Sequence, residues 1–408
     1  MNICRFCKSK NAIKILDLGK IPLSNNFIKQ NQIIHTKKYN LEIFICSKCL
    51  LVQTKDVVNK NKIFNKDYLY HSSFSKSWLE HSKNLALNLI KKFNLNKSTQ
   101  VLEIASNDGY LLNFFQKKKI PCIGIEPSAS VAKIAKKKRI KTYINFFNKE
   151  LANKLIKKKI IPKIIIALNV LAHTPNLTDF VRGIKVLMQK KGICVIEFPH
   201  LINLIKKFQF DTIYHEHFSY FSLHAIINIF KKNSMNVFSC RLIPTHGGSL
   251  RVYIKLKENS DYKIENNVNQ ILSKENKIGI NRISFYNNFN KKIERIKKIN
   301  KKKIDILSKN KKLIGYGAAA KSTIFCNSLK LTTKQIKFVV DKNKFKINRY
   351  IPGSNIRILD IKNVKKYKPD YILIFPWNLK NEIKKQLNFT KKWNCKFVIC
   401  DPILRVVK

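Results

Sequence analysis

Four of the ten cysteines in this 408-residue chain form two Cys-x-x-Cys pairs near the N-terminus, Cys4 with Cys7 and Cys46 with Cys49. Each pair can present two thiolates to one tetrahedral ion, and four such ligands leave no open coordination position. We therefore predict a structural zinc ion at these side chains. Redox-active pairs are the alternative, but two pairs in one intracellular chain fit zinc better, and the second pair lacks a thioredoxin-like context.

A second concentration of reactive side chains is the segment YHEHFSYFS, which begins at Tyr214. Its imidazoles, phenols and carboxylate can bind a metal ion or move protons. The segment NVLAHTPN, with Asn169 and His173, follows an apolar run and carries similar groups. A single histidine is usually structural, whereas so many groups in short segments favour a functional site. The glycine pair Gly247 and Gly248 would let the backbone approach a ligand closely.

The segment VLEIASNDGYLL predicts a nucleoside site, because a buried strand here runs through a tight turn into a helix. The next apolar run ends at Glu126, whose carboxylate can accept both hydroxyls of a ribose. The turn has one glycine, whereas a dinucleotide site favours G-x-G-x-x-G for its pyrophosphate. This difference favours S-adenosylmethionine (SAM) as the cofactor, and an ordinary α/β turn is the alternative. The predicted SAM contacts are Glu103, Ala105, Ser106, Asn107, Asp108, Gly109, Glu126 and Asn169.

The elements that position these groups follow an α/β rhythm. Short apolar runs, VLEIA, CIGIE, IIIALNV and GICVIEF, alternate with amphipathic stretches, which predicts a largely parallel sheet. A Lys/Asn-rich helical stretch is expected at about 262–310, and the rhythm resumes in KLIGYGAA, IKFVVD, YILIFPW and KFVICD. We expect a small zinc-binding domain over 1–62, a Rossmann-like SAM-binding core over 63–243 and a second Rossmann-like domain over 244–408.

The bulk composition indicates a globular chain, since 45% of the residues are hydrophobic. No apolar run approaches the ~18 residues that span a bilayer, and the N-terminus lacks the apolar stretch of a secretion signal. We therefore expect a cytoplasmic protein. The formal charge of +57 suggests either a polyanionic partner or compositional drift. Drift is favoured, because the lysines are spread along the chain without the interleaved aromatic residues of a nucleic-acid groove.

These motifs together resemble those of the sugar C-methyltransferases that act on nucleotide-activated 4-keto-deoxysugars. The resemblance runs along essentially the whole chain, through DLGKIPLSNNF, DYLYHSSFSKSWLEH, LEIASNDGYLL, GIEPS, NVLAHTPN, EFPH, YHEHFSYFS, HGGSLRV, GYGAAAK and the VDKNKFK…PGSNIRI segment. It implies a zinc-binding N-terminal domain, a SAM-binding core and a C-terminal Rossmann-like domain that helps to hold the nucleotide sugar.

The resemblance also implies a mechanism and its catalytic residues. A carbonyl at sugar carbon 4 acidifies the proton at carbon 3, a base removes that proton, and the enolate carbon accepts the methyl group of SAM. By motif match, His217 is the base and Tyr214 is the donor that stabilises the enolate. Glu216 would orient or charge-tune His217, and His173 would assist near the substrate.

The implied substrate contacts lie in several segments. In GYGAAAK, Gly315 and Gly317 would approach the nucleotide phosphates and Lys321 would supply a counter-charge, although a strand-helix packing turn is the alternative. Ala319 stands where relatives often have proline. The remaining implied contacts are Tyr70, His173, Glu197, Gly247 and Gly248.

We expect a monomeric enzyme that acts on a small nucleotide sugar and has no nucleic-acid or membrane partner. Two other functions remain as alternatives. An RNA methyltransferase would explain the charge, but the chain has no Asn/Asp-Pro-Pro-aromatic motif for amino methylation. A catalytically silent binding protein is the other alternative, and the complete set of Tyr214, Glu216 and His217 argues against it.

Overall fold

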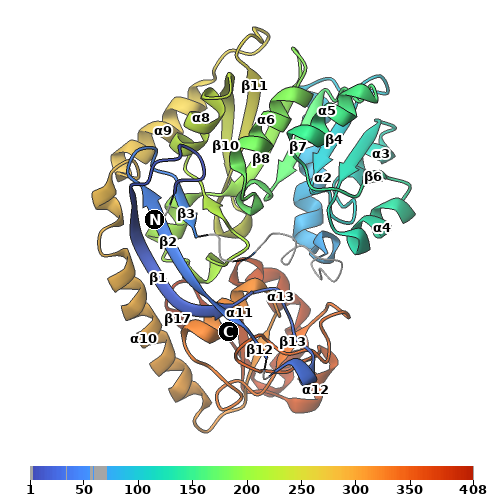
Figure 1. Cartoon of the computed structure of the whole chain (residues 1–408). Helices are drawn as coiled ribbons and strands as arrows, with labels where there is room; N and C mark the ends of the chain where they lie inside the picture. The colour runs from blue at the N-terminus through green and yellow to red at the C-terminus, as the bar shows by residue number, and fades with distance from the viewer. Residues whose placement is uncertain (1–2, 34, 56–57, 59–70, 408) are drawn as a thin grey trace.

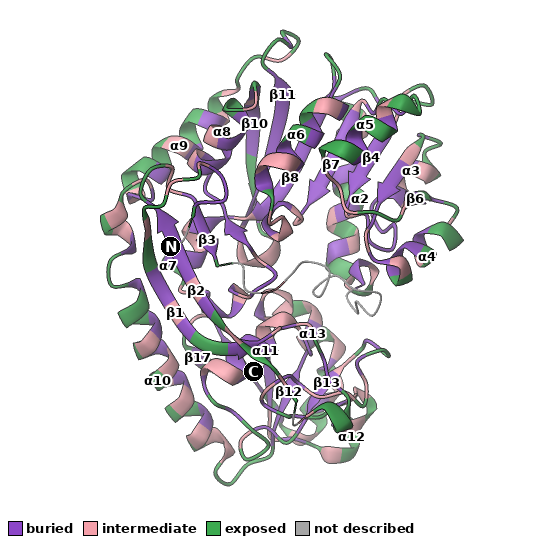
Figure 2. Cartoon of the chain, in the orientation of Figure 1, coloured by how far each residue is buried: buried purple, intermediate pink, exposed green. Residues whose placement is uncertain are grey.

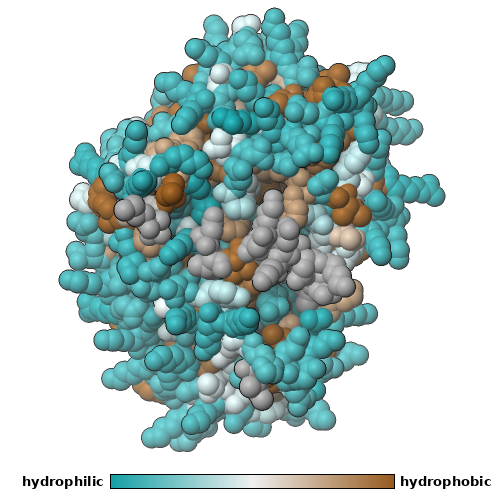
Figure 3. All heavy atoms as spheres, in the orientation of Figure 1, coloured by the Kyte–Doolittle hydropathy of each residue, from teal (hydrophilic) through white to brown (hydrophobic). Residues whose placement is uncertain are grey.

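A computed structural model of the chain describes residues 3–33, 35–55, 58 and 71–407. These residues form three β-sheets with helices packed around them (Figure 1). The apolar strands are buried, and the exposed residues lie mainly on the outer faces of the helices and in the connecting loops (Figure 2). On the face shown in Figure 3, hydrophilic side chains cover most of the surface. No helix in the described ranges has both the length and the apolar character that crossing a membrane requires.

The N-terminal sheet is antiparallel, and one of its four strands comes from far along the chain. Its order is β1 (Ala12–Pro22), β2 (Lys38–Cys46), β3 (Val52–Thr54) and β9 (Ser219–Tyr220). Strand β9 belongs to the segment YHEHFSYFS, and Tyr220 pairs with Val52 of β3. The candidate catalytic segment is therefore joined to the N-terminal sheet by backbone hydrogen bonds.

The central sheet has seven strands and contains the four apolar runs expected between residues 101 and 198. Its order is β10 (Met235–Ile243), β11 (Ser249–Leu256), β8 (Ile193–Pro199), β7 (Ile164–Leu168), β4 (Val101–Ile104), β5 (Cys122–Ile125) and β6 (Lys141–Tyr143). Strands β8, β7, β4, β5 and β6 are parallel, and β11 is antiparallel to its neighbours. The domain boundary expected after residue 243 falls between β10 and β11, which are paired strands of this sheet.

Alternating strand residues build two cores on opposite faces of the central sheet. Ile164 and Ile166 of β7 pack with α2 and α3, whereas Ile165 and Ala167 pack with α5, α6 and α8. The helices of this unit are α2 (Lys76–Lys92), α3 (Leu112–Lys117), α4 (Ala129–Lys137), α5 (Lys149–Lys157), α6 (Leu177–Leu187), α7 (Leu201–Lys206) and α8 (Leu223–Lys231). The carboxyl ends of the parallel strands meet at one edge of the sheet, which is where sites form in open α/β folds.

The helical stretch expected at 262–310 is two helices, α9 (Asn266–Ile278) and α10 (Phe289–Ser308). Gly279 ends α9 with φ of 87°, a left-handed conformation that glycine adopts without strain. The third sheet has the order β14 (Ile358–Asp360), β13 (Val339–Asp341), β12 (Leu313–Tyr316), β15 (Tyr371–Ile374), β16 (Lys396–Cys400) and β17 (Leu404–Val407). It is parallel except for β17, and its helices are α11 (Ala320–Ser328), α12 (Lys362–Tyr367) and α13 (Lys380–Gln386).

The N-terminal sheet and the C-terminal unit share one hydrophobic core. Leu16 of β1 and Ile43 of β2 belong to the same buried cluster as Ile293 of α10 and Phe325 of α11. Figure 1 shows β1 and β2 running beside α10 from the upper part of the molecule to the C-terminal unit. This packing brings the turn that follows β1 close to α11.

Candidate active site

One cavity of about 770 Å³ is lined by residues from all three sheets and their loops. The turn after β1 contributes Asn25, the strand ends of the central sheet contribute Glu126 and Asn169, and the C-terminal unit contributes Lys321 and Asp341. This volume lies within the range of about 300–1,000 Å³ that is usual for ligand sites.

Glu126 lies directly after β5 and presents its carboxylate to this cavity. The two carboxylate oxygens accept hydrogen bonds from the backbone N–H of Asn107 (3.0 Å) and of Ser128 (2.8 Å). Burial raises the pKa of Glu126 to about 7, and the two N–H donors act in the opposite direction. An acid fixed at this strand end can accept ribose hydroxyls with its remaining lone pairs.

The turn after β4 is tight although it contains only one glycine. Ala105 and Asn107 both adopt positive φ angles, of 57° and 49°, and both line the cavity. Asn169, after β7, also has a positive φ (54°), and its buried Oδ1 atom makes no hydrogen bond to any described residue. A buried polar atom without a partner at a cavity wall suits a hydrogen-bonding ligand. These residues fit SAM.

The other predicted SAM contacts support the turn instead and lie outside the cavity lining. Gly109 has φ of 74°, and a Cβ atom there would lie 2.5 Å from Cδ1 of Ile140. Asp108 accepts hydrogen bonds from the backbone N–H and the hydroxyl of Ser73. The residues concerned are Glu103, Ser106, Asp108 and Gly109. Glu103 is fully buried, and burial raises its pKa well above the usual value.

The predicted base, His217, lies at the cavity wall beside Tyr214 and His173. Its ring centre is 3.9 Å from that of Tyr214 and 4.7 Å from that of His173. Nδ1 of His217 lies 3.1 Å from the carbonyl oxygen of Thr212, which can only accept a hydrogen bond. Nδ1 must therefore carry the proton, which leaves the lone pair on Nε2. Burial lowers the pKa of His217 well below the usual value, and the nearby His173 lowers it further.

Glu216 does not contact the ring of His217, in contrast to the role that the resemblance implied. Its two carboxylate oxygens accept hydrogen bonds from the hydroxyl of Ser24 (3.1 Å) and the side-chain amide of Asn25 (2.6 Å). The Thr212 carbonyl takes the position expected for this carboxylate. The backbone oxygen of Glu216 instead lies 2.8 Å from Nδ1 of His173. The direct hydrogen bond of Glu216 to a histidine is therefore the one between its backbone and the ring of His173.

The GYGAAAK segment places only some of its predicted residues in the cavity. Gly317 and Lys321 line it, whereas a Cβ atom on Gly315 would lie 2.6 Å from the ring of Phe375 in the sheet core. The ammonium of Lys321 donates to Oδ1 of Asn378 (2.7 Å) and lies 3.7 Å from the centre of the Trp377 ring. Burial lowers the pKa of Lys321 to about 8, so the cation persists at neutral pH.

Three other predicted substrate contacts do not reach the cavity. A Cβ atom on Gly247 would meet Trp377, and one on Gly248 would meet Asn203, so both glycines permit close packing of the loop. Glu197 is fully buried and accepts hydrogen bonds from His81 (2.8 Å) and Arg251 (2.6 Å). These three residues are therefore not part of the cavity lining, and their contact with the substrate stays a prediction. Tyr70 lies outside the described residues.

Several residues in the cavity wall were not predicted from the sequence. Asp341 is the last residue of β13 and accepts hydrogen bonds from the backbone N–H of Ala318 (2.7 Å) and of Asn343 (2.8 Å), much as Glu126 accepts two after β5. Glu126 was identified as an acidic residue at the end of an apolar run, and the same criterion would have identified Asp341. His246 lines the cavity beside the two glycines, with φ of 53°. Asn25 lies in the DLGKIPLSNNF segment of the resemblance, but it was not singled out, because its contact with Glu216 joins distant parts of the chain.

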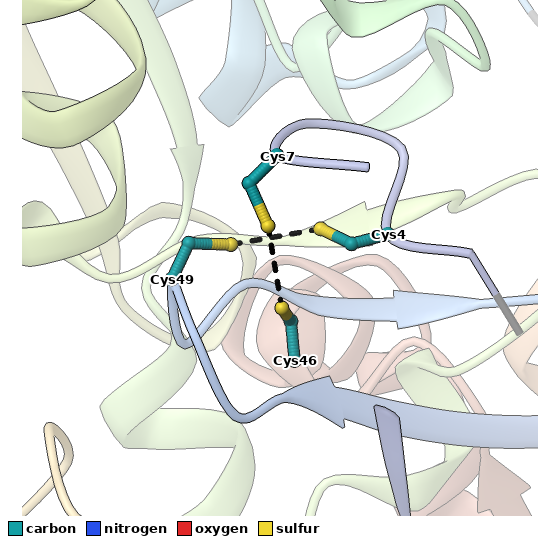
Figure 4. Close-up of side chains that lie close together, drawn as sticks. All are labelled: Cys4, Cys7, Cys46 and Cys49. Carbon is teal, nitrogen blue, oxygen red and sulfur yellow. Dashed lines mark hydrogen bonds between the residues drawn. The ribbon is translucent and has the colours of Figure 1, made fainter. Parts of the chain in front are cut away.

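The four predicted zinc ligands converge from two loops (Figure 4). Their sulfur atoms all lie within 4.8 Å of one another, and the Cys4–Cys49 and Cys7–Cys46 pairs are each separated by 3.5 Å. Tetrahedral zinc with bonds of about 2.3 Å places sulfur atoms about 3.8 Å apart, so these thiolates fit a zinc ion. Cys46 is the last residue of β2, so the zinc fixes one end of the N-terminal sheet.

Comparisons with known proteins agree with this geometry. Residues 4–64 match a putative zinc-binding domain, residues 78–239 a methyltransferase domain, and residues 244–402 a C-methyltransferase C-terminal domain. The C-methyltransferase NovU of Streptomyces niveus is 26% identical over 382 residues, which are 93% of this chain and 90% of that protein.

Solved structures with lower similarity include a SAM-dependent methyltransferase from Anabaena variabilis, at 16% identity and a TM-score of 0.35, over 43% of this chain and 84% of that one. The magnesium protoporphyrin IX methyltransferase of Synechocystis PCC 6803 with bound SAM has 14% identity and a TM-score of 0.35, over 49% of this chain and 99% of that one. The three consecutive domain matches, the NovU similarity and the cysteine cluster show that this chain belongs to the SAM-dependent C-methyltransferases with a zinc-binding N-terminal domain.

Proposed function

We propose that this C-methyltransferase acts on a nucleotide-activated 4-keto-deoxysugar and methylates the carbon next to the keto group. The observation that carries this proposal is the shared cavity. The buried, neutral imidazole of His217 lines this cavity together with Glu126 at a strand end and the cation of Lys321 in the C-terminal unit.

The base in this proposal is Nε2 of His217. It removes the proton at carbon 3, and the electron pair of the broken C–H bond forms the enolate with the carbonyl at carbon 4. The hydroxyl of Tyr214, whose ring packs on His217, donates to the enolate oxygen. When bound, SAM supplies an electrophilic methyl group to the carbon that carries the negative charge. His217 then releases its proton to solvent, which its low pKa favours.

The cofactor side and the substrate side of the cavity differ in charge. On the cofactor side, Glu126 and Asn169 would hold the nucleoside, with Ala105 and Asn107 forming the floor of the turn. On the substrate side, Lys321 presents a cation near the loop after β12, where the nucleotide phosphates would bind. Asp341 would accept hydrogen bonds from the substrate's ribose. We propose accordingly that the three regions 1–62, 63–243 and 244–408 serve zinc binding, SAM binding and nucleotide-sugar binding.

The test is incubation of the zinc-loaded protein with SAM and a panel of 4-keto nucleotide sugars. Mass spectrometry should show the gain of one methylene on at least one sugar, and matched sugars without the keto group should remain unchanged. A parallel incubation contains methyl-labelled SAM and bulk RNA at about 150 mM salt, where nonspecific electrostatic binding is weakened. Strong label transfer to RNA, with no change in any sugar, would contradict the proposal.

A further inference from the structure

The Glu216 carboxylate is buried, with 2% of the residue exposed, and both of its side-chain partners come from the N-terminal domain. The donors are the Ser24 hydroxyl and the Asn25 amide, in the turn after β1. A buried carboxylate requires such donors, because it has lost its water. Lys346 also acts on Glu216 through its charge, but its ammonium donates to the Ala318 carbonyl.

The turn that carries these donors is fixed on the opposite side by the C-terminal unit. The Thr323 hydroxyl of α11 donates to the backbone oxygen of Ser24 (2.8 Å). The Arg349 guanidinium donates to the backbone oxygen of Phe27 (3.0 Å). Asn25 is therefore held between two parts of the protein, and its side chain is part of the cavity wall.

Glu216 passes this constraint to the catalytic residues through its own backbone. Its carbonyl oxygen accepts the Nδ1–H of His173 (2.8 Å), which leaves Nε2 of His173 as the atom that can accept a hydrogen bond. Residue 216 also lies within the tight turn in which the N–H of His217 donates to the carbonyl of Tyr214 (2.9 Å). If the Glu216 side chain loses its partners and residue 216 moves, the shift of its backbone would therefore disturb both histidines.

We infer that Asn25 is a positioning residue of the active site, which holds Glu216 and thereby fixes the tautomer of His173 and the turn that carries His217. The N-terminal domain is thus a functional part of the catalytic centre in addition to its role in binding zinc. The inference rests on the proposed role of the Tyr214–His217 segment in catalysis.

The decisive variant is Asn25→Asp, which replaces the donor by a second carboxylate at hydrogen-bond distance from Glu216. Two such groups cannot both ionise, so the pair must share a proton, which is lost as the pH rises. We expect kcat about tenfold below wild type near pH 8 and within about threefold near pH 6, with the Kd for SAM unchanged. The histidines remain neutral over this interval, because burial lowers the pKa values of His173 and His217.

Two further proteins complete the design. In the double variant Asn25→Asp/Glu216→Gln, the amide introduced at position 216 can donate to the carboxylate introduced at position 25. The hydrogen bond is then restored with its direction reversed, and most of the lost kcat near pH 8 should return. Asn26→Asp is the matched control, because it makes the same change at the neighbouring exposed residue and should behave as wild type. The ¹⁵N spectrum of His173 provides a readout without substrate: Nδ1–H should persist in the double variant and be lost in Asn25→Asp near pH 8.

An unchanged His173 spectrum in Asn25→Asp would overturn the inference. A loss of kcat in Asn25→Asp that is equal at all pH values and is not rescued by Glu216→Gln would also overturn it. That result is expected if Asn25 only stabilises the turn. Because the spectrum needs no sugar, failure of every 4-keto sugar as a substrate would contradict the proposed function and leave this result to decide the inference.

Discussion

The imidazole rings of His173 and His217 lie with their centres 4.7 Å apart at an angle of 60° in the cavity wall. Each ring has its Nδ1 atom directed at a backbone carbonyl, that of Glu216 for His173 and that of Thr212 for His217. Two imidazolium ions at this separation would repel each other, and burial adds to the cost of charging either ring. The site therefore keeps two neutral rings, each with its lone pair on Nε2.

This arrangement sets the pH dependence of proton removal. A base acts in its deprotonated form, so its activity is lost as the pH falls through its pKa. Burial lowers the pKa of His173 to about 4 and that of His217 well below the usual value. We expect kcat, measured at saturating SAM and sugar, to be flat from about pH 6.5 upwards and to fall only in more acidic solution. An acid limb at or above the usual histidine pKa would contradict the assignment of His217.

Replacement of His217 by glutamine should separate proton removal from cofactor binding. We expect kcat to fall by about 10² to 10⁴, because general-base catalysis contributes on that order. SAM should bind as in wild type, as measured by calorimetry. In D₂O without SAM, wild type should exchange deuterium into carbon 3 of the keto sugar and the variant should not. His35→Gln, at an exposed position, is the control. Continued exchange in the variant would move the base to another residue.

The SAM affinity of wild type should depend on the ionisation of Glu126. Its pKa is about 7 because of burial, and the ionised carboxylate is the better acceptor for ribose hydroxyls. The Kd for SAM should therefore rise as the pH falls through about 7. Glu126→Gln should raise the Kd by about tenfold at high pH and remove the pH dependence. Titration calorimetry measures both, with the exposed Glu150→Gln as a control that keeps the wild-type profile.

The cation of Lys321 should matter for the substrate and not for the cofactor. Lys321→Met removes a charged donor held between Asn378 and the ring of Trp377. Hydrogen bonds to charged groups contribute about 1.5–3 kcal/mol, so the KM for the nucleotide sugar should rise by about tenfold or more. Steady-state kinetics at low and moderate salt should also show a weaker salt dependence of KM in the variant. Lys344→Met, an exposed neighbour outside the cavity, should leave KM unchanged.

Loss of one zinc ligand should destabilise the N-terminal sheet. Cys46 is fully buried at the end of β2, so Cys46→Ser leaves three thiolates and places a poor ligand at the fourth position. We expect the zinc content to fall from about one ion per chain to well below it, with a lower melting temperature. Metal analysis and thermal unfolding measure these changes. Cys122→Ser changes a cysteine outside the cluster and should retain zinc; equal zinc loss in both variants would contradict the assignment.

The elements of the fold were predictable because they depend on local pattern. The apolar runs that became β4, β5, β7 and β8 are short and bounded by turns, which is what a buried parallel strand requires. The four zinc ligands were predictable for a similar reason, since the spacing within each pair already brings two thiolates together. The expected helical stretch is divided in two at Gly279, a local signal that the prediction did not use.

The side-chain contacts of the site were less predictable because they join distant segments. Glu216 and His217 are adjacent in sequence, which favoured a contact between them, yet the turn directs the carboxylate away towards Ser24 and Asn25. The glycine pair at 247–248 indicated a close approach, and the side chains that approach it in the structure are those of Trp377 and Asn203. Sequence locates such a segment, whereas packing decides which of its atoms face the cavity.

The place of β9 in the N-terminal sheet has a consequence for biosynthesis. The cysteine pairs and β1 to β3 leave the ribosome early, but the strand that completes their sheet, Ser219–Tyr220, is made much later. At about 5–20 residues per second, the nascent chain carries this open strand edge for roughly 10–30 seconds. During that interval the edge is exposed to other nascent chains and to chaperones. The same pairing that joins the candidate catalytic segment to the N-terminal sheet therefore also delays the completion of that sheet.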